Sequence, residues 1–144
     1  MMEKEVSEDQ KQKFRRIVKR EKPLYYKFLG IEIVDVGLGS AKLKMDYNAN
    51  LTNPYGYLNG GFFSVLADAA VACALLGMTE ETPSRKLVTI EYKMNIIRPV
   101  KEGPITAEAR VVHLGTGIAV SETMIKNINE KVVAVGLITY SVKP

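Results

Sequence analysis

One acidic residue, Asp68, lies in the middle of an apolar stretch and is the side chain best placed to act on a ligand. Between Phe62 and Leu76 the only other side chain that is not apolar is Ser64, and the many Ala and Leu residues favour a helix. A helix that is apolar on every side should be buried all round. Since an unpaired carboxylate is unfavourable in an apolar interior, Asp68 should be hydrogen-bonded, protonated, or facing a cavity where it does chemistry.

Two glycines directly before this helix add a second chemical element. Asn59-Gly60-Gly61 places backbone without side chains at the helix N-terminus, where unpaired N–H groups and the positive end of the dipole attract a ligand oxygen. Asp68 follows Gly61 by seven residues, about two helical turns, so both lie on one face, and Ser64 shares it. A second interpretation remains open, in which the glycines form a capped turn and Asp68 is a buried, hydrogen-bonded structural residue.

Other reactive side chains are few. His113 is the only histidine and Cys73 the only cysteine, so we expect no disulfide and no metal site. The residues around Ser64 do not form a nucleophile elbow and show no His/Asp relay, which argues against a serine-hydrolase triad. We interpret His113, which lies in a strand-like alternation, as a core or surface residue.

The composition indicates one domain that acts on a small molecule. The chain has 144 residues, of which 47% are hydrophobic, enough for one compact core. Its 20 basic and 16 acidic residues give a net charge of +4 that we interpret as evenly spread, which suits an anionic small molecule better than nucleic acid. The charged N-terminus is unlike a signal peptide, and the apolar stretch is short of the roughly 20 residues needed to span a bilayer. We expect a cytoplasmic protein with no nucleic-acid or membrane partner.

An additional helix is expected at the N-terminus. Residues 1–23 have a narrow apolar stripe, and Ser7 with Gln10 resembles a capping box, so we predict an amphipathic helix that ends before Pro23. A nucleic-acid-binding arm is an alternative interpretation of its charges.

The remaining residues, 24–144, are expected to form the main domain. We predict a hairpin, the central helix ending at Gly77, and then four strands in an antiparallel meander. The predicted strands are 31–36, 40–47, 86–97, 105–114, 118–127 and 132–142. This order is typical of an α+β fold in which one curved sheet wraps around the central helix.

Several short segments together resemble the hotdog-fold acyl-CoA thioesterases of the phenylacetyl-CoA thioesterase-like (PaaI-type) branch. These segments are Asn53-Pro-x-Gly-x-Leu-Asn-Gly-Gly with Asp68 after it, Val88-Thr89, Arg98-Pro99-Val100 with Gly103, and the closing Ala134…Thr139-Tyr140. The resemblance covers residues 24–143 and implies a hotdog fold, hydrolysis of acyl-CoA to free acid and CoA, and no cofactor. It also implies homodimers with sites between subunits, often paired further into tetramers.

The resemblance also implies roles for individual residues. Asp68 matches the general base or nucleophile, and the backbone N–H of Gly60 matches the donor that polarises the thioester carbonyl. Asn53 matches a residue that orients the base or the water from the neighbouring subunit, and Thr89 matches a hydroxyl that places the water. A base and an oxyanion donor are what thioester hydrolysis requires. We predict further substrate contacts from Asn59, Gly61, Ser64 and Arg98, and we note Lys101 and Arg85 as other possible partners of the CoA phosphates.

Asn59 departs from the pattern, because the family commonly has His before the Gly-Gly pair. Asn can donate a hydrogen bond but does not titrate near neutral pH. A non-catalytic acyl-CoA-binding or regulatory module therefore stays open as the alternative function. A hotdog dehydratase fits less well, because it would use a His/acid pair and His113 is the sole histidine.

Overall fold

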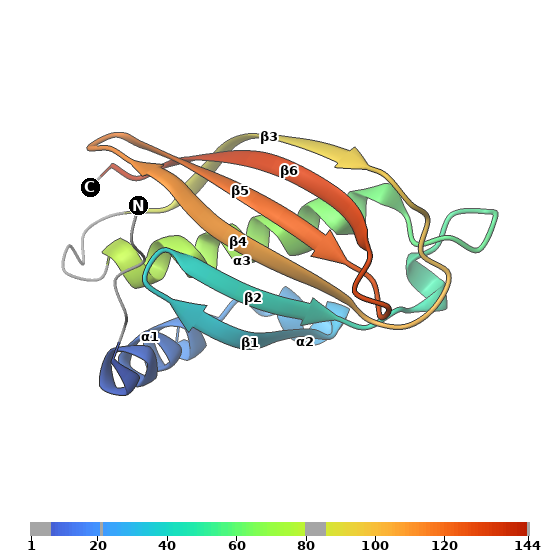
Figure 1. Cartoon of the computed structure of the whole chain (residues 1–144), viewed down its shortest axis with the longest axis horizontal. Helices are drawn as coiled ribbons and strands as arrows, with labels where there is room; N and C mark the ends of the chain where they lie inside the picture. Colours follow the sequence, from blue (N-terminus) through green and yellow to red (C-terminus); the bar gives the residue numbers. More distant parts are fainter. Residues whose placement is uncertain (1–6, 21, 80–85, 144) are drawn as a thin grey trace.

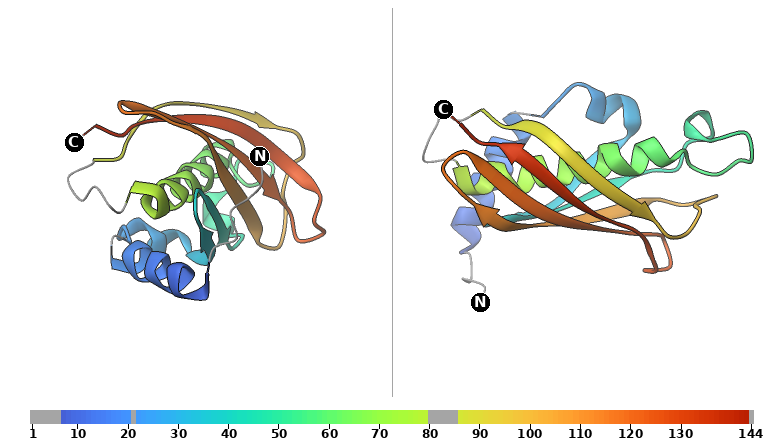
Figure 2. Two further views of the ribbon diagram at one scale, coloured as in Figure 1. Left: turned by 60° about the vertical axis from the view of Figure 1, so that its left-hand side comes forward. Right: turned by 90° about the horizontal axis from the view of Figure 1, so that it is seen from above.

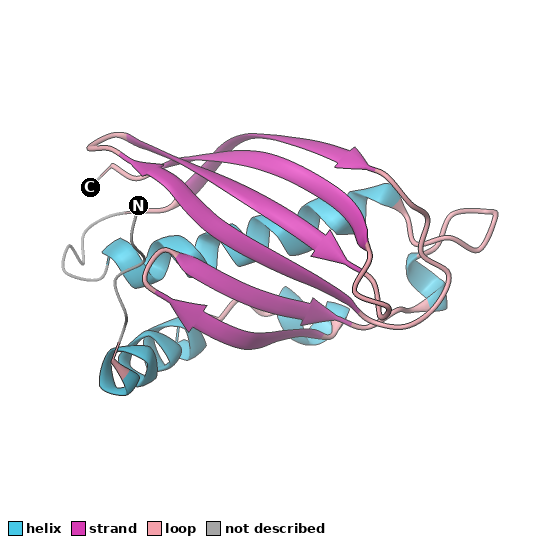
Figure 3. Cartoon of the chain, in the orientation of Figure 1, coloured by secondary structure: helices cyan, strands magenta, loops and turns pink. Residues whose placement is uncertain are grey.

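The computed structural model describes residues 7–20, 22–79 and 86–143 and shows a six-stranded antiparallel sheet wrapped around one long helix (Figures 1 and 3). The elements are α1 (Glu8–Arg20), α2 (Tyr25–Leu29), β1 (Ile31–Gly37), β2 (Ser40–Met45), the 3-10 helix η1 (Ala49–Leu51), α3 (Gly60–Thr79), β3 (Val88–Ile96), β4 (Ile105–Leu114), β5 (Ile118–Lys126) and β6 (Val132–Ser141). The predicted α+β class is confirmed. The division of the chain into an N-terminal helix, 1–23, and a main domain, 24–144, stays a prediction.

The helix α3 is the centre of the core because small side chains let it approach the sheet closely. Ala67, Ala70 and Ala74 are fully buried on the helix, and Ala107 and Ala119 are fully buried on the facing strands. The sheet curves around one side of the helix, as the left view in Figure 2 shows. Burying the apolar residues of α3 against the sheet is the main stabilising contribution.

The predicted end of α3 at Gly77 is wrong, since the helix continues to Thr79. Met78 packs against Gly39 in the turn between β1 and β2, and this tertiary contact holds the last turn in place. By length and composition alone Gly60–Met78 is apolar enough to cross a membrane, with a mean hydropathy of 1.9. In this fold the same segment is the core helix of the sheet domain.

The sheet order corrects the predicted four-strand meander. The order is β1-β2-β4-β5-β6-β3, so β4, β5 and β6 form a meander as predicted, whereas β3 pairs with β6 rather than with β4. The connection 97–104 carries the chain across the end of the sheet, where Leu58 N–H donates to Val100 O at 2.8 Å. This arrangement makes β3 an edge strand and places Thr89 opposite Tyr140.

The N-terminal segment folds as two helices. The capping box of α1 is confirmed, because Ser7 N–H donates to Gln10 Oε1 at 3.1 Å and Gln10 N–H donates to Ser7 Oγ at 3.3 Å. An ion pair of 3.2 Å between Arg15 and Asp35 joins α1 to β1. Sequence patterns missed the short helix α2, which ends at Gly30 in the left-handed region, φ 68°.

The lone thiol allows a direct test of the core. Burial raises the pKa of Cys73 from an ordinary value of 9.0 to about 11. We therefore expect iodoacetamide at mildly alkaline pH to label the native protein at least about 100-fold more slowly than the urea-unfolded protein. The unfolded thiol ionises first, so Cys73 also lowers the free energy of unfolding as the pH rises from 9.0 to about 11. Equal labelling rates in the two states would contradict the buried position.

Candidate active site

Two hydroxyl groups from the sheet fix one oxygen of the Asp68 carboxylate. Thr89 Oγ1, on β3, and Tyr140 Oη, on β6, both donate to Asp68 Oδ1 at 2.8 Å. Tyr140 Oη also lies 3.1 Å from the main-chain oxygen of Asp68. Within the part of the chain that the structure describes, no protein group donates to Asp68 Oδ2. The carboxylate is thus held in one orientation with one oxygen left for a ligand or water.

The face of α3 that carries Asp68 is incompletely covered. Ser64, Asp68, Ala72 and Leu76 follow one another at intervals of four residues and are only partly buried, and Gly61 is exposed. The expectation that α3 is buried all round is therefore wrong for this stripe. Sheet strands and the N-terminal helices α1 and α2 pack on the other faces of α3, but no described element closes this one. An acid on an open stripe favours the functional interpretation of Asp68 over the purely structural one.

Tyr140 belongs to a segment that carries the family resemblance, but sequence reasoning gave it no role in the site. Its neighbour two positions earlier, Ile138, is fully buried, and the alternation of β6 turns Tyr140 inward as well. A buried tyrosine hydroxyl needs a polar partner, and this requirement was the signal that could have indicated Asp68. Burial raises the pKa of Tyr140 well above its usual value, so its hydroxyl stays a proton donor across the neutral range.

A second tyrosine, Tyr25 on α2, is affected by the charge of Asp68. Burial, and next the charge of Asp68, raise the pKa of the Tyr25 hydroxyl. The adjacent Tyr26 fixes α2, because its hydroxyl donates to Ala69 O at 3.4 Å. The short helix that the sequence patterns missed is therefore attached to α3 at the residue after Asp68.

Removing the Tyr140 hydroxyl should affect turnover more than binding. We expect Tyr140→Phe to lower kcat about tenfold with little change in KM, because one of the two hydrogen bonds that orient Asp68 is lost. Steady-state kinetics on a CoA thioester measures this. Tyr26→Phe is the matched control. It removes another buried hydroxyl, one that donates from α2 to the main chain of α3 and does not contact the Asp68 carboxylate. Equal effects of both variants would mean that Tyr140 has only a packing role.

At the start of α3, the two glycines differ in what they offer a ligand. Asn59 is the N-cap, and its Oδ1 accepts the N–H of Gly61 at 3.0 Å. Gly61 N–H is therefore occupied. In the described residues no acceptor faces the N–H of Gly60, the first residue of α3, so Gly60 is the available donor at this helix N-terminus.

Asn53 organises the loop that leads to Gly60. Its Oδ1 accepts the N–H groups of Tyr55 at 3.0 Å and Tyr57 at 3.1 Å, so only its Nδ2 is left to meet water or substrate. Asn59 N–H donates to Leu51 O at 2.9 Å and connects this loop to the helix start. The orienting role toward a neighbouring subunit stays a prediction.

Arg98 lies at the same end of the molecule as Gly60. Its guanidinium donates to the carbonyl of Val132, and its neighbour Ile96 packs against Gly60. Lys101 stacks on Tyr57 with its Nζ 4.8 Å from the ring centroid. These basic groups remain candidates for contacts with CoA phosphates, whereas Arg85 lies outside the described residues.

The predicted site residues, together with Tyr140, therefore form two clusters. The Asp68 cluster contains Asp68, Thr89 and Tyr140; the Gly60 cluster contains Gly60, Asn59, Asn53 and Arg98. Ser64 lies on α3 between them, and no group in the described residues bonds its hydroxyl. Eight residues of helix separate Gly60 from Asp68, about 12 Å along the axis. Asp68 and the glycines do share a face, but this distance is too long for both to contact one thioester carbonyl within a single chain.

The comparison with known proteins decides the family. Residues 55–134 match the family model of the thioesterase superfamily, more than half of the 144 residues. The chain belongs to the thioesterase superfamily. A 1,4-dihydroxy-2-naphthoyl-CoA hydrolase from Listeria monocytogenes is 31% identical over 115 residues, which are 80% of this chain and 92% of that protein.

Solved structures place the superfamily member within the hotdog fold. The PaaI protein of the Escherichia coli phenylacetic acid degradation operon is 26% identical, with a TM-score of 0.81 over 93% of this chain and 99% of that chain. A thioesterase from Haemophilus influenzae is 27% identical, with a TM-score of 0.80 over 96% and 92% of the two chains. The predicted hotdog fold, the PaaI-type likeness and the thioester hydrolase class are confirmed.

His113 and the side chains that could bind a metal are candidates outside the Asp68 cluster. The described residues contain no group of three His, Cys, Asp or Glu side chains that could hold a metal ion. His113 is exposed and pairs with Val120 beside a bulge in β4. The alternation of the strands turns both residues away from α3, so His113 is a surface residue as predicted.

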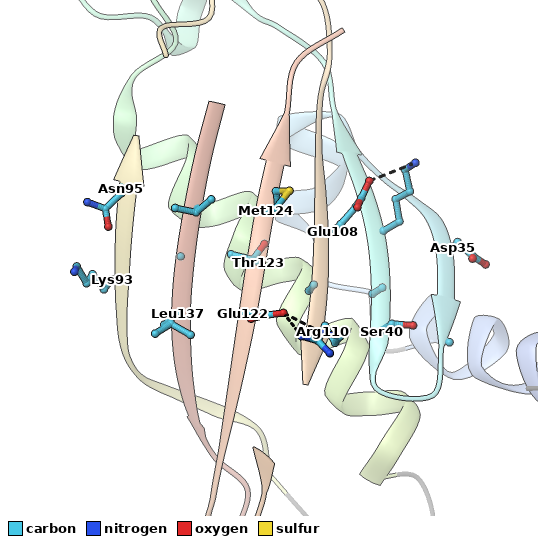
Figure 4. Close-up of a pocket in the computed structure, with 16 residues that line it drawn as sticks. Asp35, Ser40, Lys93, Asn95, Glu108, Arg110, Glu122, Thr123, Met124 and Leu137 are labelled. Carbon is cyan, nitrogen blue, oxygen red and sulfur yellow. Dashed lines mark hydrogen bonds and ion pairs between the residues drawn. The ribbon is translucent and has the colours of Figure 1, made fainter. Parts of the chain in front are cut away.

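A hollow of this thioesterase lies on the outer face of the sheet, away from Asp68. It has a volume of about 720 Å³, and Figure 4 shows the side chains from several neighbouring strands that line it. Ion pairs between Arg110 and Glu122 and between Lys42 and Glu108 lie among its lining side chains, while Leu137 and Met124 stay exposed. None of the predicted site residues lines it, so its size does not make it the reaction centre.

Proposed function

We propose that this protein hydrolyses acyl-CoA thioesters to free acid and CoA, with Asp68 as general base or nucleophile. The observation that carries the proposal is the carboxylate whose Oδ1 is held by Thr89 and Tyr140 while its Oδ2 has no protein donor in the described residues. The relatives named as CoA hydrolases and thioesterases support the same reaction. A cytoplasmic location is part of the proposal.

The free oxygen of Asp68 is suited to either of two steps. As a base it takes a proton from water while the water oxygen attacks the thioester carbon. As a nucleophile it attacks that carbon itself and forms an anhydride, which water then cleaves. In both cases the thiolate of CoA leaves, and an N–H donor at the carbonyl oxygen stabilises the negative charge that develops.

A second copy of the chain supplies that donor in our proposal. Because Gly60 of the same chain is about 12 Å from Asp68 along α3, the donor is Gly60 of the partner subunit. The edge strand β3 suits such a dimer, since Tyr92 and Ile96 are on its inner face and are 52% and 47% exposed. Antiparallel pairing of two β3 edges would cover them and bring the open stripes of the two α3 helices together.

The dimers are proposed to pair further through the outer face of the sheet. Among the side chains that line the hollow there, Arg110 pairs with Glu122 and Lys42 with Glu108, and Leu137 is 50% exposed among them. A second sheet could cover Leu137 and Met124 while these charges stay paired. Light scattering distinguishes a dimer from a tetramer.

Turnover of a panel of CoA thioesters, from short chains through aryl groups to long chains, tests the proposed reaction. Release of free thiol from at least one of them supports hydrolysis. The alternative, a module that binds acyl-CoA without turnover, is motivated by Asn59, which caps α3 where the family commonly has His. Tight binding of all esters with no thiol release, together with turnover by Asn59→His, would establish that alternative.

A further inference from the structure

The positive charge of the chain is concentrated in its first two helices. Residues 8–28 contain eight Lys or Arg and three Asp or Glu, a net charge of +5, whereas residues 29–144 contain 11 of each and are neutral. The interpretation of an evenly spread charge is therefore wrong. α1 and α2 lie on the same side of the molecule, beneath α3 and beside β1 (Figures 1 and 2), so one side of the protein is basic and the rest is balanced.

Two large apolar side chains project from the same region. Leu24 and Phe28 are 94% and 82% exposed, and the spacing of four residues puts them on one side of α2. Lys22 and Lys27, also exposed, stand beside them. Tyr26 and Leu29 already attach α2 to the core, so the projecting pair has no role in folding. Exposed apolar groups surrounded by cations are typical of proteins that dock on membranes.

We propose that α1 and α2 form a docking surface for anionic lipid bilayers. Leu24 and Phe28 enter the headgroup region, and the exposed cations of α1 and α2, Arg16, Lys19 and Lys27 among them, contact the lipid phosphates. We call these five residues the lipid-docking surface. The expectation of no membrane partner is revised in this one respect, since docking needs no spanning segment.

Two other occupants fit the surface less well. Nucleic acid would satisfy the cations but would give Leu24 and Phe28 no apolar environment. A second copy of the chain, packed symmetrically, would bring two segments of net charge +5 against each other. Only an anionic bilayer offers phosphate charge and an apolar layer together.

The position of α2 gives the docking a consequence for the site. Tyr26 fixes α2 to Ala69, the residue after Asp68. A protein docked through Leu24 and Phe28 therefore holds the open stripe of α3 near the lipid surface, where acyl chains partition. Docking does not depend on hydrolysis, and its test involves no turnover.

Co-sedimentation of the full-length protein with lipid vesicles tests the proposal. At low salt we expect binding to vesicles of equal parts phosphatidylglycerol and phosphatidylcholine, and little binding to phosphatidylcholine alone. Leu24→Ser/Phe28→Ser should lower the partition coefficient at least about tenfold. Arg16→Gln/Lys19→Gln/Lys27→Gln should lower it by a similar factor or more, because each cation near an anionic surface contributes about fivefold.

Matched controls remove the same groups elsewhere. Ile128→Ser removes an exposed apolar side chain, and Lys131→Gln/Lys143→Gln removes exposed charge; neither should change vesicle binding. No binding of wild-type protein to the anionic vesicles would overturn the proposal, and so would unchanged binding by Leu24→Ser/Phe28→Ser. A smaller mass of that double variant in light scattering would instead assign the apolar pair to an interface between copies and also overturn it.

Discussion

Asp68→Asn is expected to lower kcat by about 10²–10⁴, because the amide can neither accept a proton from water nor attack a thioester carbon. The side chain keeps its shape, and its remaining oxygen can still accept the hydrogen bonds from Thr89 and Tyr140. The fold should therefore survive, with a melting temperature close to that of the wild type. Steady-state turnover of the best CoA thioester, together with thermal unfolding, measures both effects.

A binding measurement distinguishes a variant that has lost only the chemical step from one that has lost the substrate site. Asp68→Asn should still bind a non-hydrolysable acyl-CoA analogue, since the Gly60 cluster is unchanged. Wild-type turnover by this variant would rule Asp68 out as base or nucleophile.

The pH profile of turnover should be the same in His113→Ala as in the wild-type enzyme, because His113 lies on the outer face of the sheet. A limb of the profile that disappears in this variant would contradict that placement.

Gly60→Pro should lower kcat by about 10²–10³ and affect KM much less, because it deletes the one unoccupied N–H at the start of α3. Gly60 is the first helical residue, a position that tolerates proline well. A side chain there meets only the flexible end of Ile96, which is 47% exposed and can move. Gly60→Ala is the matched control, since it adds the side chain and keeps the N–H.

Mixing two inactive variants tests whether each site needs two chains. When Asp68→Asn and Gly60→Pro chains are unfolded together and refolded, half of the dimers contain one of each. Such a dimer has one site with both intact groups, so activity should recover to about a quarter of the wild-type value. If the mixture stays as inactive as its components while light scattering shows dimers, the donor does not come from the partner subunit.

Local patterns predicted every strand and the two longer helices of this fold, but not the short helix α2. The apolar run around Asp68 predicted the core helix, and alternation predicted each strand to within a few residues. The place of β3 could not be predicted in this way, because a short connection indicates nearness in the chain and not pairing in the sheet. Only the packing of 97–104 across the sheet end, fixed by the bond between Leu58 and Val100, puts β3 next to β6.

The candidate site shows the same limit. Asp68 could be predicted because a lone acid in an apolar helix needs a partner or a function. Gly60 could be predicted because the Gly60-Gly61 pair leaves the backbone at the helix start open to a ligand. The role of Tyr140 depends on a contact between residues 72 positions apart, which no local pattern reveals. The helical rise already implied that Asp68 and Gly60 lie far apart along α3. Residues on one face of a helix do not for that reason belong to one site.

The unbroken helix between Gly60 and Asp68 also limits how this sequence can diverge. Each residue of α3 adds about 1.5 Å and turns the next side chain by about 100°. Substitutions leave the interval intact, whereas one inserted or deleted residue would turn Asp68 away from the hydroxyls of Thr89 and Tyr140. We therefore expect insertions and deletions among descendants of this gene to accumulate in exposed loops outside α3. The first eight residues of α3 should be substituted but should stay eight in number.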